Sequence, residues 1–191
     1  MMLGKRVMEH MKLTAKIEDV KLVVGLLGSS KGYLERGVEL LEGQFGAVDF
    51  ASEIIPFDYT TYYNREMGDS IVRQFLSFEK LVYPGRLAEI KVDTNQMEQI
   101  EAVDRCRRIN IDPGYLTLAS VVLATTKDAS FRVYLGKGIF AQTTLCYRDN
   151  TFQPYEWTYK DYRDERHIAF FNRVRDKYRQ QMQAVRAKKN D

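Results

Sequence analysis

The fold is decided by the stretch RRINIDPGYLTLASVVLATTKD, residues 107–128. Its first six residues alternate between polar and apolar, a period of two that is typical of a β-strand with one face on a core. Ile109 and Ile111 then face the core, and the opposite face carries Arg108, Asn110 and Asp112. The segment therefore predicts a strand that presents a cation, an amide and a carboxylate on one side.

The residues after this strand predict a helix. Asp112 stands directly before Pro113, the arrangement expected of an N-cap followed by proline at the first helical position. The apolar residues that follow recur at helical spacing, at Leu116, Ala119, Val122 and Leu123. We expect this helix to end at Lys127-Asp128, and we favour a capping role for Asp112 over a catalytic one.

The flanking segments predict further strands and helices. Strands are expected at 21–28, at 48–55 and in a hairpin whose arms, 130–135 and 139–147, are joined by Gly136-Lys137-Gly138. Helices are expected from Ser29 or Ser30 to Phe45, within 86–105 and over about 163–188. In the second of these, Met97, Ile100 and Val103 form the apolar side, although residues 89–92 also fit a strand. Residues 71–82 fit either a strand or a helix.

Together these elements predict an α+β fold. We expect a single domain with a mixed or mainly antiparallel sheet of about five strands packed by helices, plus a long C-terminal helix. The expected organisation is a flexible N-terminal arm over 1–20, a core domain over 21–162, and a basic amphipathic helix and tail over 163–191. A chain of 191 residues, 45% of them hydrophobic, is long enough to bury one such core.

Charge and cysteine content narrow the class of protein. Lys and Arg number 29 against 26 Asp and Glu, so the net charge of +3 does not by itself indicate a nucleic-acid partner. Cys106 and Cys146 belong to no CxxC pair and are too few for a disulfide framework, as in a reducing cytosol. No apolar run approaches the roughly 18 residues of a membrane helix, and the first residues lack a signal-peptide core. We therefore expect a cytoplasmic protein without a membrane partner.

Three familiar kinds of site are incomplete in this sequence. The segment 25–32 lies where a P-loop would, but Ser30 replaces the second glycine and Gly32 replaces the hydroxyl residue after the lysine. The tripeptide 126–128, Thr-Lys-Asp, lacks one residue of the guanine-reading motif of GTPases. His10 and His167 lie at opposite ends of the chain, without ligands at metal-binding spacing. We expect no P-loop GTP site, no zinc or other metal centre and no histidine-based triad.

Polar residues on the predicted strands form the candidate ligand site. If these strands are neighbours, their cationic, amide and hydroxyl side chains gather on one surface, although a simple antiparallel sheet with one wet face predicts the same pattern. The predicted ligand-binding residues are Arg108, Asn110, Asp112, Lys127, Arg132, Tyr134, Lys137 and Gln142. Arg108 and Arg132 would grip an anion through charge-assisted hydrogen bonds. The carboxylates available for acid–base chemistry, or for magnesium if the ligand is a phosphate, are Asp58, Asp112 and Asp128.

Several ordered motifs resemble a bacterial family of uncharacterised proteins. They are PFDYT at 56–60, INIDPGYL at 109–116, ATTKD at 124–128 and WTYKDY at 157–162, and the resemblance spans about 21–178. Members of that family carry a domain-of-unknown-function label and sometimes a GTP-binding tag, so the resemblance implies no catalytic residues. The family resembled often has Ala-Glu-Val-Thr-Leu where this chain has Ala141-Gln-Thr-Thr-Leu145, which puts any scheme with a carboxylate at 142 in doubt.

The sequence thus predicts a cytosolic protein that binds a small anionic or phosphorylated ligand, nucleotides included, at a polar face of its sheet. The alternative is a non-enzymatic RNA-associated or protein-adaptor module. That alternative would use the tyrosine-rich loop at 57–63 and the basic C-terminal helix. The pattern leaves open whether the protein is an enzyme, what its cofactor is and how it assembles.

Overall fold

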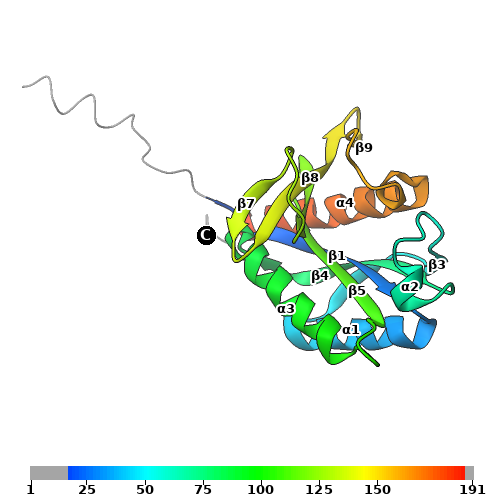
Figure 1. The fold of residues 1–191 in the computed structure, drawn as a ribbon. Coiled ribbons are helices and arrows are strands. Elements are labelled where there is room, and N and C mark those ends of the chain that lie inside the picture. The colour runs from blue at the N-terminus through cyan, green and yellow to red at the C-terminus, as the bar shows by residue number, and fades with distance from the viewer. Residues whose placement is uncertain (1–16, 188–191) are drawn as a thin grey trace, which may run out of the picture.

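The structure, a computed structural model that describes residues 17–187, is built on an antiparallel sheet (Figure 1). Within those residues the sheet has nine strands, in the order β2-β4-β1-β5-β6-β8-β7, with β3 beside β4 and β9 beside β8. Their bounds are β1 Val20–Gly28, β2 Val48–Ala51, β3 Ile55–Pro56, β4 Val72–Val82, β5 Ile109–Leu116, β6 Ser120–Thr125, β7 Val133–Gly136, β8 Ile139–Arg148 and β9 Thr151–Pro154. The α+β class and the antiparallel sheet are confirmed, whereas the predicted number of about five strands is too low.

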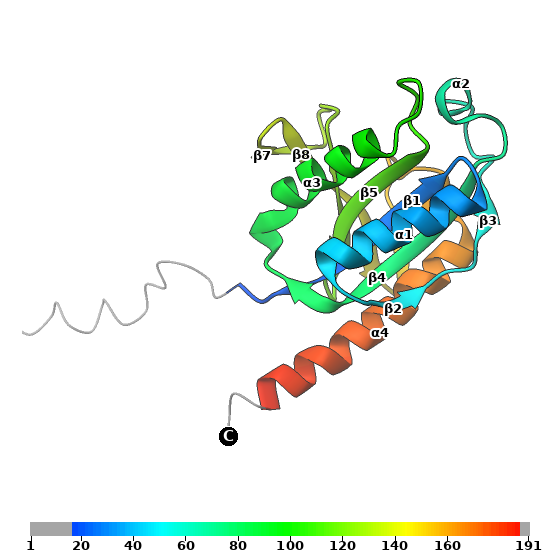
Figure 2. The ribbon, with the colours of Figure 1, turned by 90° about the horizontal axis from the view of Figure 1, so that it is seen from below.

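Helices cover both faces of the sheet (Figures 1 and 2). The helices are α1 (Lys31–Phe45), α2 (Asn64–Met67), α3 (Leu87–Ile100) and α4 (Glu165–Ala187). Alternate residues of β1 point to opposite sides: Leu22, Val24 and Leu26 pack towards α1 and α3. Val23 instead packs towards α4, against Phe171 and its neighbours. Because β1 is buried on both faces, it has the continuous apolar run that the sequence showed.

Several local predictions are confirmed. The side chain of Ser30 accepts a hydrogen bond from the N–H of Tyr33 and caps α1, and Gly46 ends that helix. The hairpin β7–β8 turns through Lys137, and the C-terminal helix forms as α4. The arm predicted for 1–20 lies outside the described residues up to residue 16, as do residues 188–191. No helix within 17–187 combines the length and apolar character needed to cross a membrane.

The helix predicted over 113–128 is wrong, because this stretch forms the end of β5 and all of β6. Residues 121–124 are buried on both faces, so they lack the polar alternation that identifies a half-exposed strand. A short turn separates the two strands, in which Thr117 Oγ1 accepts the N–H groups of Ala119 and Ser120. Asp112 is consequently a strand residue and not an N-cap.

The expected apolar side of α3 is also wrong. Ile100 is 73% exposed and Val103 lies beyond the helix and is exposed as well. The buried side consists instead of Leu87, Ala88, Ile90, Lys91, Thr94 and Glu98. Half of that side is polar, so a search for apolar spacing alone could not find it. The strand alternative for 89–92 is wrong too, while 71–82 forms β4 and 48–55 divides between β2 and β3.

The sheet opens between β5 and β6. The two strands share three residue pairs, from Gly114↔Leu123 to Leu116↔Val121, whereas β1 and β5 share eight. Where β5 leaves β6, side chains of α3 take over as partners of its free edge: Lys91 Nζ donates to the carbonyl of Ile111 at 2.6 Å, and Glu98 Oε1 accepts the N–H of Ile111 at 2.7 Å. The divergence therefore leaves a gap whose backbone groups are satisfied.

Candidate functional site

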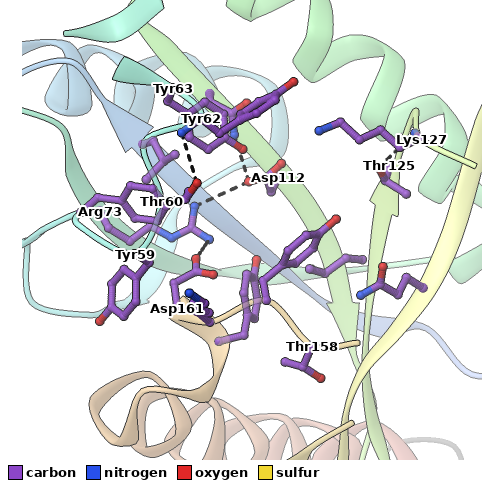
Figure 3. Close-up of a pocket in the computed structure, with 18 of the residues that line it drawn as sticks. Tyr59, Thr60, Tyr62, Tyr63, Arg73, Asp112, Thr125, Lys127, Thr158 and Asp161 are labelled. Atoms are coloured by element: carbon purple, nitrogen blue, oxygen red, sulfur yellow. Dashed lines mark hydrogen bonds and ion pairs between the residues drawn. The ribbon is translucent and has the colours of Figure 1, made fainter. Parts of the chain in front are cut away.

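A cleft of about 780 Å³ occupies this gap (Figure 3). The tyrosine loop, residues 57–63, forms one wall, and the loop 156–163 forms another. Residues of α3, β4 and β5 line its inner part, and β6 and β8 close the remaining side. Its volume falls in the range typical of small-molecule sites, and segments that are far apart in the sequence meet around it.

Alternating charges form a chain along the inner part of the cleft. Arg73 contacts Asp161 at 2.7 Å and Asp112 at 3.6 Å. Lys91 lies 3.9 Å from both Asp112 and Glu98. Glu98 in turn accepts a bond from Arg107 at 3.0 Å. Burial raises the pKa of the Glu98 carboxyl against the opposing effect of Lys91.

Asp112 is the member of this chain that reaches the cleft space. Its side chain is 30% exposed, whereas Arg73, Lys91, Glu98 and Asp161 are all nearly enclosed. Oδ2 accepts a bond from Asn110 Nδ2 at 2.9 Å, and the closest cation to Oδ1 is Lys91 at 3.9 Å. Asp112 therefore presents an oxygen that a ligand could use.

Three buried polar atoms around the cleft have no hydrogen-bond partner among the described residues. They are Arg73 Nε, Gln142 Nε2 and the hydroxyl of Tyr162. Each belongs to a side chain that is no more than 2% exposed. An unsatisfied buried polar group costs about 1–3 kcal/mol and is rare in native proteins. Three of them at one cleft indicate a place for a bound polar molecule.

The tyrosine loop is held over the cleft at two points. Arg107 binds Glu66 of α2 through two parallel hydrogen bonds, Nε–Oε1 and Nη2–Oε2, both 2.8 Å. At the start of the loop, the hydroxyl of Tyr59 donates to Asp164 Oδ2 at 2.5 Å. Burial and this bond raise the pKa of Tyr59 to about 12. The loop is thus anchored to β5 at one end and to the start of α4 at the other.

Tyrosine hydroxyls surround Asp112 and Arg73. Burial raises the pKa of Tyr63, Tyr159 and Tyr162, and the charge of Asp112 raises all three further. These phenols therefore stay protonated at neutral pH. They can donate hydrogen bonds to a ligand, but they are unsuited to act as bases.

Cations without carboxylate partners gather at the mouth. Lys127 Nζ lies 4.2 Å from the centre of the Tyr62 ring, so it reaches across from β6 towards the tyrosine loop (Figure 3). Arg163 donates to backbone carbonyls, among them that of Thr158 at 2.8 Å. Lys160 also lines the cleft. Within the described part of the chain none of these three cations forms an ion pair with a carboxylate.

The structure brings four of the eight predicted ligand-binding residues into the cleft: Asn110, Asp112, Lys127 and Gln142. Arg132 lies beside it, donating to Gln142 Oε1 at 2.9 Å and to the Tyr159 hydroxyl at 3.0 Å. Tyr134 and Lys137 are exposed on the β7–β8 hairpin and do not line the cleft. Of the carboxylates considered for chemistry, Asp112 lines the cleft, whereas Asp58 and Asp128 are exposed outside it.

Arg108 does not line the cleft, and Arg107 does. The period of two holds only inside β5, which begins at Ile109. Before it the chain turns, with positive φ angles at Asp104 and Arg105, so the side-chain alternation is reset. Arg108 therefore does not meet Arg132, and the pair that was expected to grip an anion is not formed.

Arg73, Lys91, Glu98 and Asp161 line the cleft but were not identified from the sequence. Arg73 had a local signal, because it shares the buried face of β4 with Phe75 two residues later, an unusual place for an arginine. That signal needs 71–82 to be recognised as a strand first. Asp161 had no local signal, since its partner Arg73 is 88 residues away in the sequence.

No three His, Cys, Asp or Glu residues within 17–187 are grouped so that they could hold a metal ion. The residues of the alternative function are placed as follows. Tyr59, Tyr62 and Tyr63 line the cleft. On α4, Arg175 lies over the ring of Tyr147 at 3.5 Å, and Arg179 pairs with Asp176. RNA association or an adaptor role stays a prediction.

His167 lies behind the cleft and gives a pH-dependent prediction. The ring is 1% exposed, and its Nδ1 lies 2.6 Å from the carbonyl of Asp161, so Nδ1–H donates and Nε2 carries the lone pair. Burial lowers the pKa of His167 below 6.5, with the charge of Arg73 acting in the same direction. The unfolded chain then binds a proton more readily than the folded one does. The stability contributed by this ring is full above about pH 6.5 and is lost as the pH falls below it.

A His167→Asn variant tests this prediction, because the Asn amide can still donate to the Asp161 carbonyl but does not titrate. Urea unfolding between pH 7.5 and 5 should show a smaller loss of stability for the variant than for the parent chain. Equal pH slopes for the two proteins would contradict it, whatever constant stability difference the smaller side chain causes.

Comparison with known proteins adds a family and no activity. A family model described as a domain of unknown function, DUF4416, matches residues 18–178. No curated protein and no solved structure matches the chain.

Proposed function

Because the chain belongs to the DUF4416 family of unknown function, we propose its function from the cleft: it binds a small organic ligand that carries a phosphate or another anionic group. Nucleotides and sugar phosphates both fall in this class. The observation that carries the proposal is the set of buried, unpartnered donors at Arg73, Gln142 and Tyr162 in a cleft whose mouth is cationic.

The balance of charge supports an anion at the mouth. Six cationic side chains line the cleft, namely Arg73, Lys91, Arg107, Lys127, Lys160 and Arg163, against four carboxylates, namely Glu98, Asp112, Glu156 and Asp161. The inner members of both sets neutralise one another through the ion pairs described above. The cations left over lie at the opening, where a positive potential attracts anionic ligands and speeds their association.

Aromatic walls support an organic ligand rather than a free inorganic ion. Tyr62, Trp157 and Tyr159 line the cleft and are each at least a third exposed. Trp157 is held in place by stacking on Tyr155 at 4.8 Å and by donating Nε1–H to the carbonyl of Thr143. Rigid aromatic faces beside a few fixed polar groups are the usual composition of a small-molecule site.

Titration calorimetry with a panel of nucleotides and sugar phosphates tests the proposal, and Lys127→Ala is the informative variant. A hydrogen bond between charged groups contributes about 1.5–3 kcal/mol, so losing Lys127 should weaken binding about tenfold or more. The reason is that Lys127 reaches over the mouth from β6 with no carboxylate partner in the described chain.

Lys31→Ala is the matched control. Lys31 is an exposed lysine of α1, pairs with Glu35 at 3.7 Å and does not line the cleft, so its removal should leave affinity unchanged. If no compound of the panel binds the parent chain, or if both lysine variants weaken binding equally, the cleft is not the anion site proposed.

A further inference from the structure

We infer that the part of the ligand lying inside the cleft is a polyhydroxylated ring, held by Asp112 on one side and by Gln142 and Tyr162 on the other. This inference rests on the proposed function and names the chemistry of the same site. A free sugar phosphate and the ribose of a nucleotide share that chemistry. The inference stands on which donors and acceptors the cleft leaves open.

The environment of Asp112 selects neutral donors. Its carboxylate already lies 3.6 Å from Arg73 and 3.9 Å from Lys91, so its charge is offset by two cations. A ligand ammonium approaching Asp112 would meet both of these cations at short range. A hydroxyl group donates to Oδ1 without bringing a charge, and hydrogen bonds to an ionised acceptor are stronger than neutral ones.

The other open groups are mainly donors, and their orientation is fixed. Arg132 donates to Gln142 Oε1, so the amide presents Nε2, which is buried without a partner. The hydroxyl of Tyr162 is also unpartnered and stays protonated. These groups need acceptors from the ligand, whereas Asp112 needs donors. A group that both donates and accepts, as a sugar hydroxyl does, satisfies both requirements in any order around a ring.

The local packing leaves room for such a ring. An added Cβ on Gly25 of β1 would lie 2.8 Å from Arg73 Nη2 and 2.8 Å from the Tyr162 hydroxyl, so glycine lets these two groups lie directly on the sheet. The rings of Tyr63 and Tyr159 stand beside them as cleft walls. Flat apolar faces next to polar tips fit the two kinds of surface of a sugar, its C–H faces and its hydroxyl rim.

The test measures binding of phosphate esters that differ in their hydroxyl groups. The probes are a hexose phosphate, ribose 5-phosphate, a nucleoside 5′-monophosphate and butyl phosphate, which has no hydroxyl on its chain. We expect at least one hydroxylated ester to bind ten or more times tighter than butyl phosphate. Comparing ribose 5-phosphate with the nucleotide shows whether a base adds affinity, which separates the free sugar phosphate from the nucleotide as the source.

Two variants locate the effect. Asp112→Asn and Gln142→Met each remove one side of the hydroxyl recognition, and each should bring the affinity ratio of the hydroxylated ester to butyl phosphate towards one. Two variants on different strands are used because Asp112→Asn leaves Arg73 and Lys91 less compensated. Thermal unfolding of each variant shows whether it is folded before binding is measured.

The outcomes separate this inference from the function on which it rests. If all the esters bind alike, or if both variants keep the parent's affinity ratio, the polyhydroxylated ring is wrong while anion binding stands. If no ester binds the parent chain, the proposed function fails and the inference fails with it.

Discussion

An Arg73→Ala variant is expected to lose about 3–5 kcal/mol of unfolding free energy, because it leaves buried carboxylates without their cation. Arg73 is 1% exposed and contacts Asp161, itself buried, at 2.7 Å. Its guanidinium also lies 4.4 Å from the centre of the Phe75 ring, so packing and a cation–π contact are lost with the charge. Urea denaturation at neutral pH measures the loss.

Arg86→Ala is the matched control for charge removal. Arg86 is half exposed and lies 3.7 Å from Glu89 on the surface, where an ion pair contributes less than about 1 kcal/mol. A loss for Arg73→Ala as small as that of the control would mean that water reaches Asp161 freely. The enclosed chain of charges beneath the cleft would then be incorrect.

A Gly114→Ala variant should be destabilised by about 1–3 kcal/mol or more, because the site has no room for a methyl group. A Cβ at this position would lie 2.4 Å from the backbone carbonyl oxygen of Val122 and 2.6 Å from Leu123 Cδ2. The first of these atoms belongs to β6 and cannot rotate away. Gly114 forms the last pair with β6 before the strands diverge, so the variant should also weaken ligand binding at the cleft.

Gly43→Ala should have the opposite sign. Gly43 lies in α1 and a Cβ there would meet nothing within 4 Å, so the substitution should stabilise the helix by about 0.5–1 kcal/mol. Thermal and urea unfolding of the two variants side by side measure both effects. Stabilisation by both alanines would show that β5 and β6 do not approach as closely at Gly114 as the structure has them.

Local chemistry was sufficient to predict the elements whose signal is contained in a few neighbouring residues. The buried strand at 21–28, the Ser30 cap of α1, the glycine hairpin and the long C-terminal helix all form. Half of the predicted ligand-binding residues lie in the cleft, because β5 does alternate from Ile109 onwards. In each case the period or the turn chemistry acts over less than one element.

The helix expected over 113–128 failed because residues buried on both faces carry no alternation, so spacing alone cannot separate a strand from a helix there. The same limit hid the polar buried side of α3. Lys91 and Glu98 are buried because they bind the free edge of β5, and that edge is free only because β6 diverges.

By itself the sequence determined where strands and helices with local signals begin, and that a polar strand face would carry Asn110 and Asp112. Only the tertiary structure decided that β5 and β6 separate after three pairs and that Arg73 meets Asp161 in the space below. It also decided that Arg107 rather than Arg108 faces the cleft. The physical reason is that ion pairs and strand divergence are set by groups distant in the chain, whereas periodicity reports only on neighbours.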